Sequence, residues 1–86
     1  MTHSPLKADL SLGSPAAYRI VVQGLLDQGA SEFLGGLHIT TCRRAERSPT
    51  TTLEGQLGDQ AQLLGVLNSL YELHLPILAV EVLETG

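Results

Sequence analysis

The chain has 86 residues, a formal net charge of -4 and a pI near 5.1. This length fits one small domain with a thin hydrophobic core, for which oligomerisation is an available source of stability. Because phosphate contacts need a basic surface, the acidic balance argues against nucleic acid as a partner. The single cysteine, Cys42, cannot form an internal disulfide and favours a reducing compartment.

No membrane segment is expected in this sequence. Polar residues and a proline interrupt even its most apolar stretch, 63–83, at Asn68, Glu72, His74, Pro76 and Glu81. No stretch therefore reaches the roughly 18 apolar residues that a membrane-spanning helix needs. Residues 1–17 also lack the apolar stretch of a signal peptide. We therefore expect a cytoplasmic protein that does not bind membranes.

The N-terminal half of the chain predicts a tail, a strand and a short helix. Residues 1–16 combine Ser, Pro and Gly with scattered Leu, and their lack of periodicity predicts a flexible tail before a single domain at 17–84. Alternating β-branched residues predict a first strand over 18–23. A short helix is expected over 27–34, with Asp27 as its N-cap and two glycines after its end.

The clearest element in the sequence is a helix over 59–75. Asp59 is a suitable N-cap, and Gln62 follows three residues later, as in a capping box. The helix is expected to end before Pro76, because the residue before a proline avoids the helical region. Its apolar stripe is expected to face the core and comprises Leu63, Leu64, Leu67, Leu70, Tyr71, His74 and Leu75.

Three further strands are expected at 37–44, 51–57 and 77–83, because apolar and polar residues alternate along each. The complete order is then strand, helix, strand, strand, helix, strand. This order predicts an α+β fold, a ferredoxin-like βαββαβ sandwich, in which right-handed crossovers place both helices on one face. Its four-stranded antiparallel sheet would have the spatial strand order fourth, first, third, second.

No catalytic, cofactor-binding or metal site is expected. Cys42 and His38 share one face of a strand, but four residues along a strand span roughly 13 Å, which is too far for one shared ion. His74 belongs to the helical layer instead. The glycines of the chain match no phosphate-binding loop and are expected in turns and helix caps.

A basic hairpin is the first candidate for binding. Three of the five basic residues lie in or beside the loop between the second and third strands, namely Arg43, Arg44 and Arg47. Three guanidinium groups fit an anionic ligand or an acidic partner surface. The alternative is a solvated loop that keeps the sheet edge from aggregating.

The outer face of the sheet is the second candidate, because it mixes apolar and polar side chains. Glu54 and Glu81 are expected there, either solvated or paired with Arg19. The apolar members, which form a candidate oligomer interface, are Val21, Ile77, Ala79 and Leu83. A homodimer or a protein partner bound through this face, or through an edge strand, is the leading assembly hypothesis.

Four short motifs lie between Tyr18 and Leu83: YxIxVxG, GLxIT, TLxG and the block DQAxLxGxLxxLxxLxLPxL. In these motifs the chain resembles a family of small uncharacterised bacterial proteins. The resemblance implies no activity, because that family has none assigned. Members of the family often carry a Trp-rich short helix where this chain has Phe33. The matching residues are Tyr18, Ile20, Val22, Gly24, Gly36, Leu37, Ile39, Thr40, Thr52, Leu53, Gly55, Asp59, Gln60, Ala61, Leu63, Gly65, Leu67, Leu70, Leu73, Leu75, Pro76 and Leu78.

These observations favour a non-enzymatic interaction or regulatory module that forms a homodimer. The alternative is a small-ligand or anion sensor, whose site would lie at a subunit interface or at the basic hairpin; this alternative rests on analogy between folds. An enzyme that uses Cys42 or His38 is the least favoured hypothesis.

Overall fold

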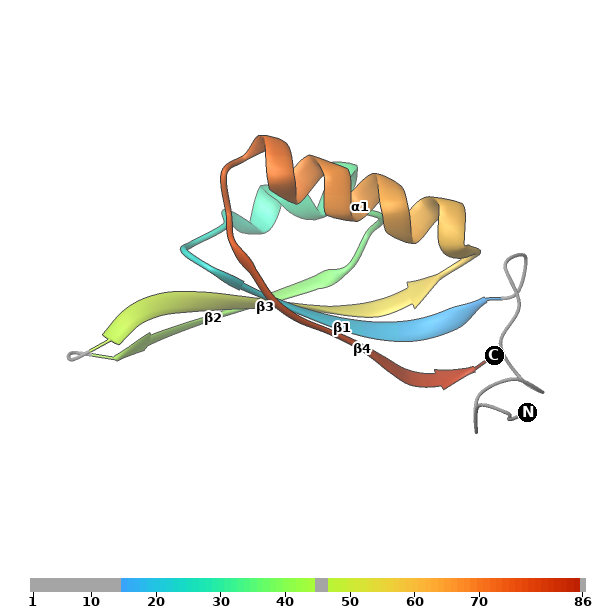
Figure 1. Ribbon diagram of the computed structural model, residues 1–86, viewed down its shortest axis with the longest axis horizontal. Helices are drawn as coiled ribbons and strands as arrows, with labels where there is room; N and C mark the ends of the chain where they lie inside the picture. Colours follow the sequence, from blue (N-terminus) through green and yellow to red (C-terminus); the bar gives the residue numbers. More distant parts are fainter. Residues whose placement is uncertain (1–14, 45–46, 86) are drawn as a thin grey trace, which may run out of the picture.

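The computed structural model describes residues 15–44 and 47–85, which contain one α-helix, one 3-10 helix and four strands (Figure 1). Of the tail expected at 1–16, residues 1–14 lie outside the described residues, and Ala16 already belongs to the first strand. The elements in chain order are β1 (Ala16–Gln23), η1 (Gln28–Phe33), β2 (His38–Arg44), β3 (Arg47–Leu57), α1 (Gln60–Glu72) and β4 (Ile77–Thr85).

The four strands form one antiparallel sheet with the order β2-β3-β1-β4. This is the order expected from the sequence, with β1 and β3 in the centre and β2 and β4 at the edges. Both crossing segments, η1 and α1, cover the same face of the sheet and leave the other face bare (Figure 1). The molecule is therefore an α+β sheet with one covered face.

The core lies between the sheet and the layer of η1 and α1. Alternate residues of β1 are fully buried there, because successive side chains of a strand point to opposite faces. The Tyr18 hydroxyl is buried in this core and has no hydrogen-bond partner among the described residues. The buried apolar residues are Ala16, Tyr18, Ile20, Val22, Ala30, Leu34, Leu37, Ile39, Leu53, Leu57, Val66 and Leu70.

The first crossing segment is not the α-helix expected over 27–34. It is the six-residue 3-10 helix η1, and the Asp27 side chain makes no capping hydrogen bond. Its side chains bind the main chain of the next segment instead: Gln28 Nε2 donates to the Ile39 carbonyl at 2.7 Å, and Ser31 Oγ donates to the Leu37 carbonyl at 2.8 Å. A segment this short, which contains Gly29, does not sustain an α-helix without a cap.

Gly35 lets the chain leave η1 beneath α1. Its φ of 75° lies in the left-handed region, which glycine adopts without a steric penalty. A Cβ atom at this position would also lie 2.8 Å from Leu57 Cδ2 and 3.3 Å from Val66 Cγ2. The close contact between this turn and α1 therefore depends on the missing side chain.

The start of α1 confirms the capping pattern. Asp59 Oδ1 accepts a hydrogen bond from the Gln62 amide at 2.8 Å. Gln62 Oε1 in turn accepts from the main-chain amide of Gly58 at 2.7 Å, one residue before the N-cap. These bonds satisfy one free amide of the first helical turn and the amide of the residue before the N-cap.

The end of α1 comes at Glu72, three residues earlier than the sequence predicts. His74 has a φ of 62°, so the chain turns out of the helix before it reaches Pro76. The His74 amide donates to the Tyr71 carbonyl at 2.9 Å, and the Leu75 amide donates to the Leu70 carbonyl at 3.2 Å. These two bonds form a Schellman motif, in which a residue other than glycine occupies the left-handed position.

The core-facing side of α1 also differs from the predicted stripe. Val66 and Leu70 are buried, and Leu63 and Leu67 are partly buried against the core. Leu64 and Tyr71, which were expected to face the core, are 61% and 78% exposed. The period of the apolar residues does not fix the rotation of a helix about its own axis. The centre of the stripe predicted from the sequence therefore lies too close to these two residues.

Candidate functional site

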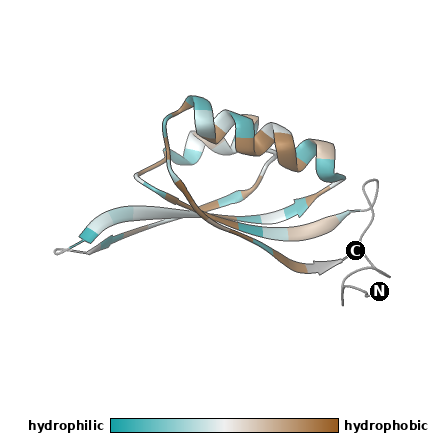
Figure 2. Ribbon diagram, viewed as in Figure 1, coloured by the Kyte–Doolittle hydropathy of each residue, from teal (hydrophilic) through white to brown (hydrophobic). Residues whose placement is uncertain are grey.

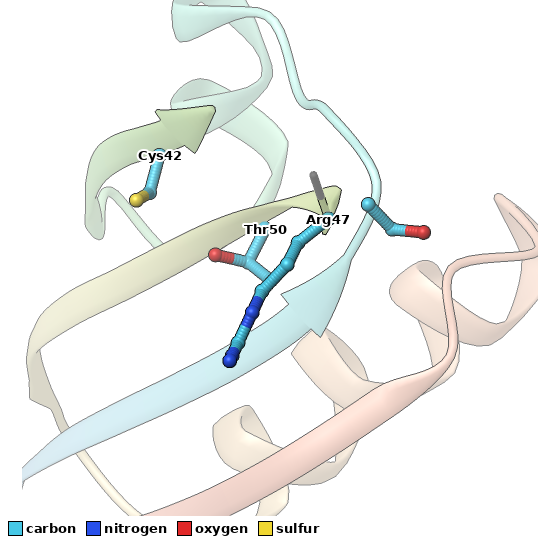
Figure 3. A pocket seen from close by; sticks show the side chains of 4 residues that line it. Cys42, Arg47 and Thr50 are labelled. Carbon is cyan, nitrogen blue, oxygen red and sulfur yellow. The ribbon is translucent and has the colours of Figure 1, made fainter. Parts of the chain in front are cut away.

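A shallow hollow lies on the β2–β3 hairpin. It is lined by Cys42 of β2 and by Arg47, Ser48 and Thr50 of β3, three of which Figure 3 labels. Cys42 and Thr50 are register partners on the two strands. The register shifts between Cys42 and Arg44, so that Arg44 pairs with Arg47. The shift brings the start of β3 next to the Cys42 end of β2.

The hollow offers hydrogen-bond donors from several kinds of side chain. A guanidinium group, two hydroxyls and a thiol meet there, and all of them can donate to an anion. The free thiol of Cys42 is exposed, as are the side chains of Arg47 and Ser48. The geometry therefore fits a small anion held at the surface.

The three arginines of the predicted basic hairpin have different positions. Arg47 lines the hollow, and Arg43 is exposed without lining it. Arg44 belongs to β2, while its side chain lies outside the described residues. The sequence did not associate Cys42 with Arg47. The register of the hairpin brings these two residues to the same hollow. This register depends on a bulge whose position was not predicted.

An ion cluster occupies the open face of the sheet. The Arg19 guanidinium contacts Glu54 at 2.5 Å on one neighbouring strand and Glu81 at 3.1 Å on the other. The hydrogen bonds that Arg19 donates to Glu54 and then to Glu81 raise the pKa of Arg19 above its ordinary value. Of the two expectations for these glutamates, the structure therefore shows pairing with Arg19 across three strands.

The four apolar residues predicted as an interface do not form one patch. Val21 and Ala79 are register partners and half-buried. Leu83 is separated from them by the Arg19 and Glu81 pair. A bulge in β4 pairs Ile77 with Val22, which belongs to the buried row of β1. The ladder therefore places Ile77 outside the row of Val21.

A second apolar surface, which the sequence analysis missed, lies on the other side of the sheet. Several large apolar side chains of α1 and β4 are well exposed. Figure 2 shows hydrophobic residues along both elements. The sequence contains one sign of this surface, because Glu72 is the only charged residue between Gln60 and Val80. We name this surface the β4–α1 shelf; its exposed residues are Leu64, Tyr71, Leu78 and Val80, and the partly buried Leu67 lies on the same flank of α1.

Two further findings concern the described residues alone. Within 15–44 and 47–85, no three His, Cys, Asp or Glu side chains gather as a metal site would require. The single α-helix in these ranges lacks the length and apolar character needed to span a membrane.

The comparison with known families gives one match. The model of a domain of unknown function (DUF8691) matches residues 17–81. The chain belongs to this family. The match covers β1 to the middle of β4, so it includes the hairpin hollow, the ion cluster and the shelf. No curated protein and no solved structure matches the chain.

Proposed function

We propose that this protein is a non-enzymatic interaction module that functions as a homodimer. The observation that supports this function most directly is the arrangement of the layers. η1 and α1 cover one face of the sheet and leave the other bare (Figure 1), and the covered side still exposes the β4–α1 shelf. A small domain with two such uncovered surfaces gains stability from a partner.

The homodimer is tested by sedimentation velocity of the full chain from about 1 to about 500 μM, a range that covers weak and moderate complexes. We expect the weight-average mass to rise from one copy towards two across this range. A mass of one copy at the highest concentration would contradict the homodimer. A second protein retained at constant stoichiometry by the purified chain would show that the module acts through a different partner.

A second candidate function is the binding of a small anion, and the hairpin hollow favours it. Arg47, Ser48 and Thr50 place a cation and two hydroxyls around one surface depression. Thermal unfolding in inorganic phosphate or sulfate tests it, because a ligand that binds the folded state raises the midpoint. We expect Arg47→Gln to remove the increase and Arg43→Gln, at an exposed position outside the hollow, to preserve it.

We infer a relationship to ferredoxin-like domains, which the strand order β2-β3-β1-β4 supports despite the single α-helix. We infer a cytoplasmic location, which the exposed free thiol of Cys42 supports, because such thiols persist under reducing conditions. The bacterial origin of the family rests on the DQAxLxGxLxxLxxLxLPxL block at 59–78.

A further inference from the structure

The two edges of the sheet are covered to different degrees. On the side that faces the core, Ile39 of the edge strand β2 is 1% exposed. On the opposite edge, Val80 pairs with the fully buried Ile20 and therefore points to the same side, yet it is 43% exposed. Leu78 of the same strand is 54% exposed. The layer of helices thus covers the core-facing side chain of β2 and leaves the corresponding side chain of β4 partly exposed.

The position of α1 explains this difference. Val66 faces the turn at Gly35, which connects η1 to β2, so the Val66 flank of α1 packs towards that turn. Leu67, Tyr71 and Leu64 are spaced three and four residues apart and share the flank on the far side of the buried Leu70. η1 lies behind α1 in Figure 1 and β4 is the strand in front, so this flank is on the β4 side of the helix. The shelf therefore has an apolar floor from β4 and an apolar wall from α1.

Charge distinguishes the shelf from the rest of the molecule. Two copies of a chain with a net charge of -4 repel each other, so they associate best where neither presents a charge. No residue of the shelf is charged. Glu81 of β4 forms a salt bridge with Arg19. The register places this salt bridge on the opposite face of the sheet.

β4 also lacks the features that usually prevent edge strands from pairing. The stretch 77–83 contains no lysine and no proline, and its one charged residue is neutralised by Arg19. At the other edge, by contrast, Gln28 and Ser31 occupy main-chain carbonyls at Ile39 and Leu37. β4 does carry two bulges, which limit its regular ladder to Ala79–Val82. Side-chain contacts rather than a long ladder would therefore supply most of an interface.

We propose that the β4–α1 shelf is the surface through which two copies of this chain form the homodimer, an inference that rests on the proposed function. A two-fold axis would place the shelf of one copy against the shelf of the other, so each apolar wall would be covered by apolar side chains of its partner. The open sheet face, whose centre is the Arg19 ion cluster, then stays in solvent or serves another partner.

The size of the shelf fits a small, reversible interface. The 13 residues of α1 are about 20 Å long, the wall is about one helix diameter, or 10 Å, high, and the floor, which β4 alone supplies, is about one strand spacing, or 5 Å, wide. The projected area is then about 300 Å² per copy, and the side-chain relief brings the total for two copies to roughly 800 Å². This total is below the range of stable interfaces, so we expect a weak dimer with a dissociation constant of about 100 μM.

The test compares variants by sedimentation velocity, with circular dichroism to verify that each one is folded. Tyr71→Glu and Leu64→Glu introduce a carboxylate into the shelf at positions that are 78% and 61% exposed in the single copy, so the monomer should tolerate them. Each substitution occurs twice in the dimer. We expect the dissociation constant to rise at least tenfold for each. Phe33→Glu is the matched control, because Phe33 is 60% exposed on η1, and it should change the constant by less than about twofold.

Thr40→Arg separates the inference from the function on which it rests, because Thr40 is exposed on the outer row of β2. A dimer weakened by Thr40→Arg and unaffected by both shelf variants would overturn the shelf and preserve the homodimer. A wild-type chain that stays monomeric would overturn both.

A disulfide cross-link gives an independent readout. In a Cys42→Ser background, Val80→Cys should form a covalent dimer under mild oxidation if two copies of β4 meet near the axis. Phe33→Cys in the same background should remain monomeric. Equal cross-linking of the two variants would indicate random collision and would contradict the proposal.

Discussion

The two segments that cross the sheet, η1 and α1, are held by different forces. α1 buries Val66 and Leu70 against the sheet, and the Asp59 carboxylate caps the Gln62 amide in its first turn. η1 buries one residue, Ala30, and binds β2 through hydrogen bonds from Gln28 and Ser31 to main-chain carbonyls. The comparison shows that a crossing segment does not need a full α-helix if its polar side chains donate hydrogen bonds to main-chain carbonyls of the neighbouring segment.

The largest effect is expected from removing the buried contact of α1. Leu70→Ala should lower the free energy of unfolding by about 3 kcal/mol, because Leu70 is fully buried and its truncation leaves a cavity. Urea denaturation followed by circular dichroism measures the change. Leu64→Ala is the control on the same helix and should cost less than about 0.5 kcal/mol at its exposed position. Similar losses for both variants would mean that α1 is rotated from the orientation described.

The next effect concerns the polar attachment of η1. Ser31→Ala should lower the free energy of unfolding by about 1 to 2 kcal/mol, since it leaves the carbonyl of the buried Leu37 without its donor. Hydrogen exchange of the β2 amides should accelerate in parallel, because η1 is attached to that strand. Glu32→Ala, at an exposed position of η1 with no such bond among the described residues, should leave both quantities nearly unchanged.

The two aspartates before the crossing segments give a matched pair. Asp59→Ala should lower the free energy of unfolding by about 1 kcal/mol, because its carboxylate caps α1. Asp27→Ala should cause almost no change, because the Asp27 side chain makes no capping bond at η1. Chemical denaturation of the two variants side by side provides the measurement. Equal losses would show that η1 also depends on a cap, and the contrast between the segments would disappear.

The smallest effect should be a gain in stability at the end of α1. His74 occupies the left-handed position of the Schellman motif with a φ of 62°, where glycine has no steric penalty. His74→Gly should therefore raise the free energy of unfolding by about 0.5 kcal/mol, after the larger entropy of glycine in the unfolded chain is subtracted. The midpoint of thermal unfolding should rise accordingly. A lower midpoint would indicate that the imidazole makes a stabilising contact.

The sequence predicted the parts of the fold that depend on local patterns. Alternation located all four strands, and Asp59 with Gln62 located the start of α1 within one residue. The strand order followed from right-handed crossovers. These features need no knowledge of distant contacts, which is why a single sequence was sufficient for them.

The parts that were predicted incorrectly depend on contacts between distant residues. η1 is stable because Gln28 reaches a carbonyl of β2, and no periodicity within 27–34 reports this bond. The bulges of β4 follow from its pairing with β1 and move Ile77 out of the predicted surface row. The exposure of Tyr71 depends on which flank of α1 packs against the core. The candidate surfaces were therefore harder to predict than the elements that carry them.

The two tyrosines of the chain have opposite environments, which makes them built-in optical probes. Tyr18 is 1% exposed in the core, Tyr71 is 78% exposed on the shelf, and the sequence contains no tryptophan to mask their emission. A small neutral quencher should reach Tyr71 in the free chain and not Tyr18. Fluorescence of the unlabelled protein can therefore report folding through one ring and the occupancy of the shelf through the other.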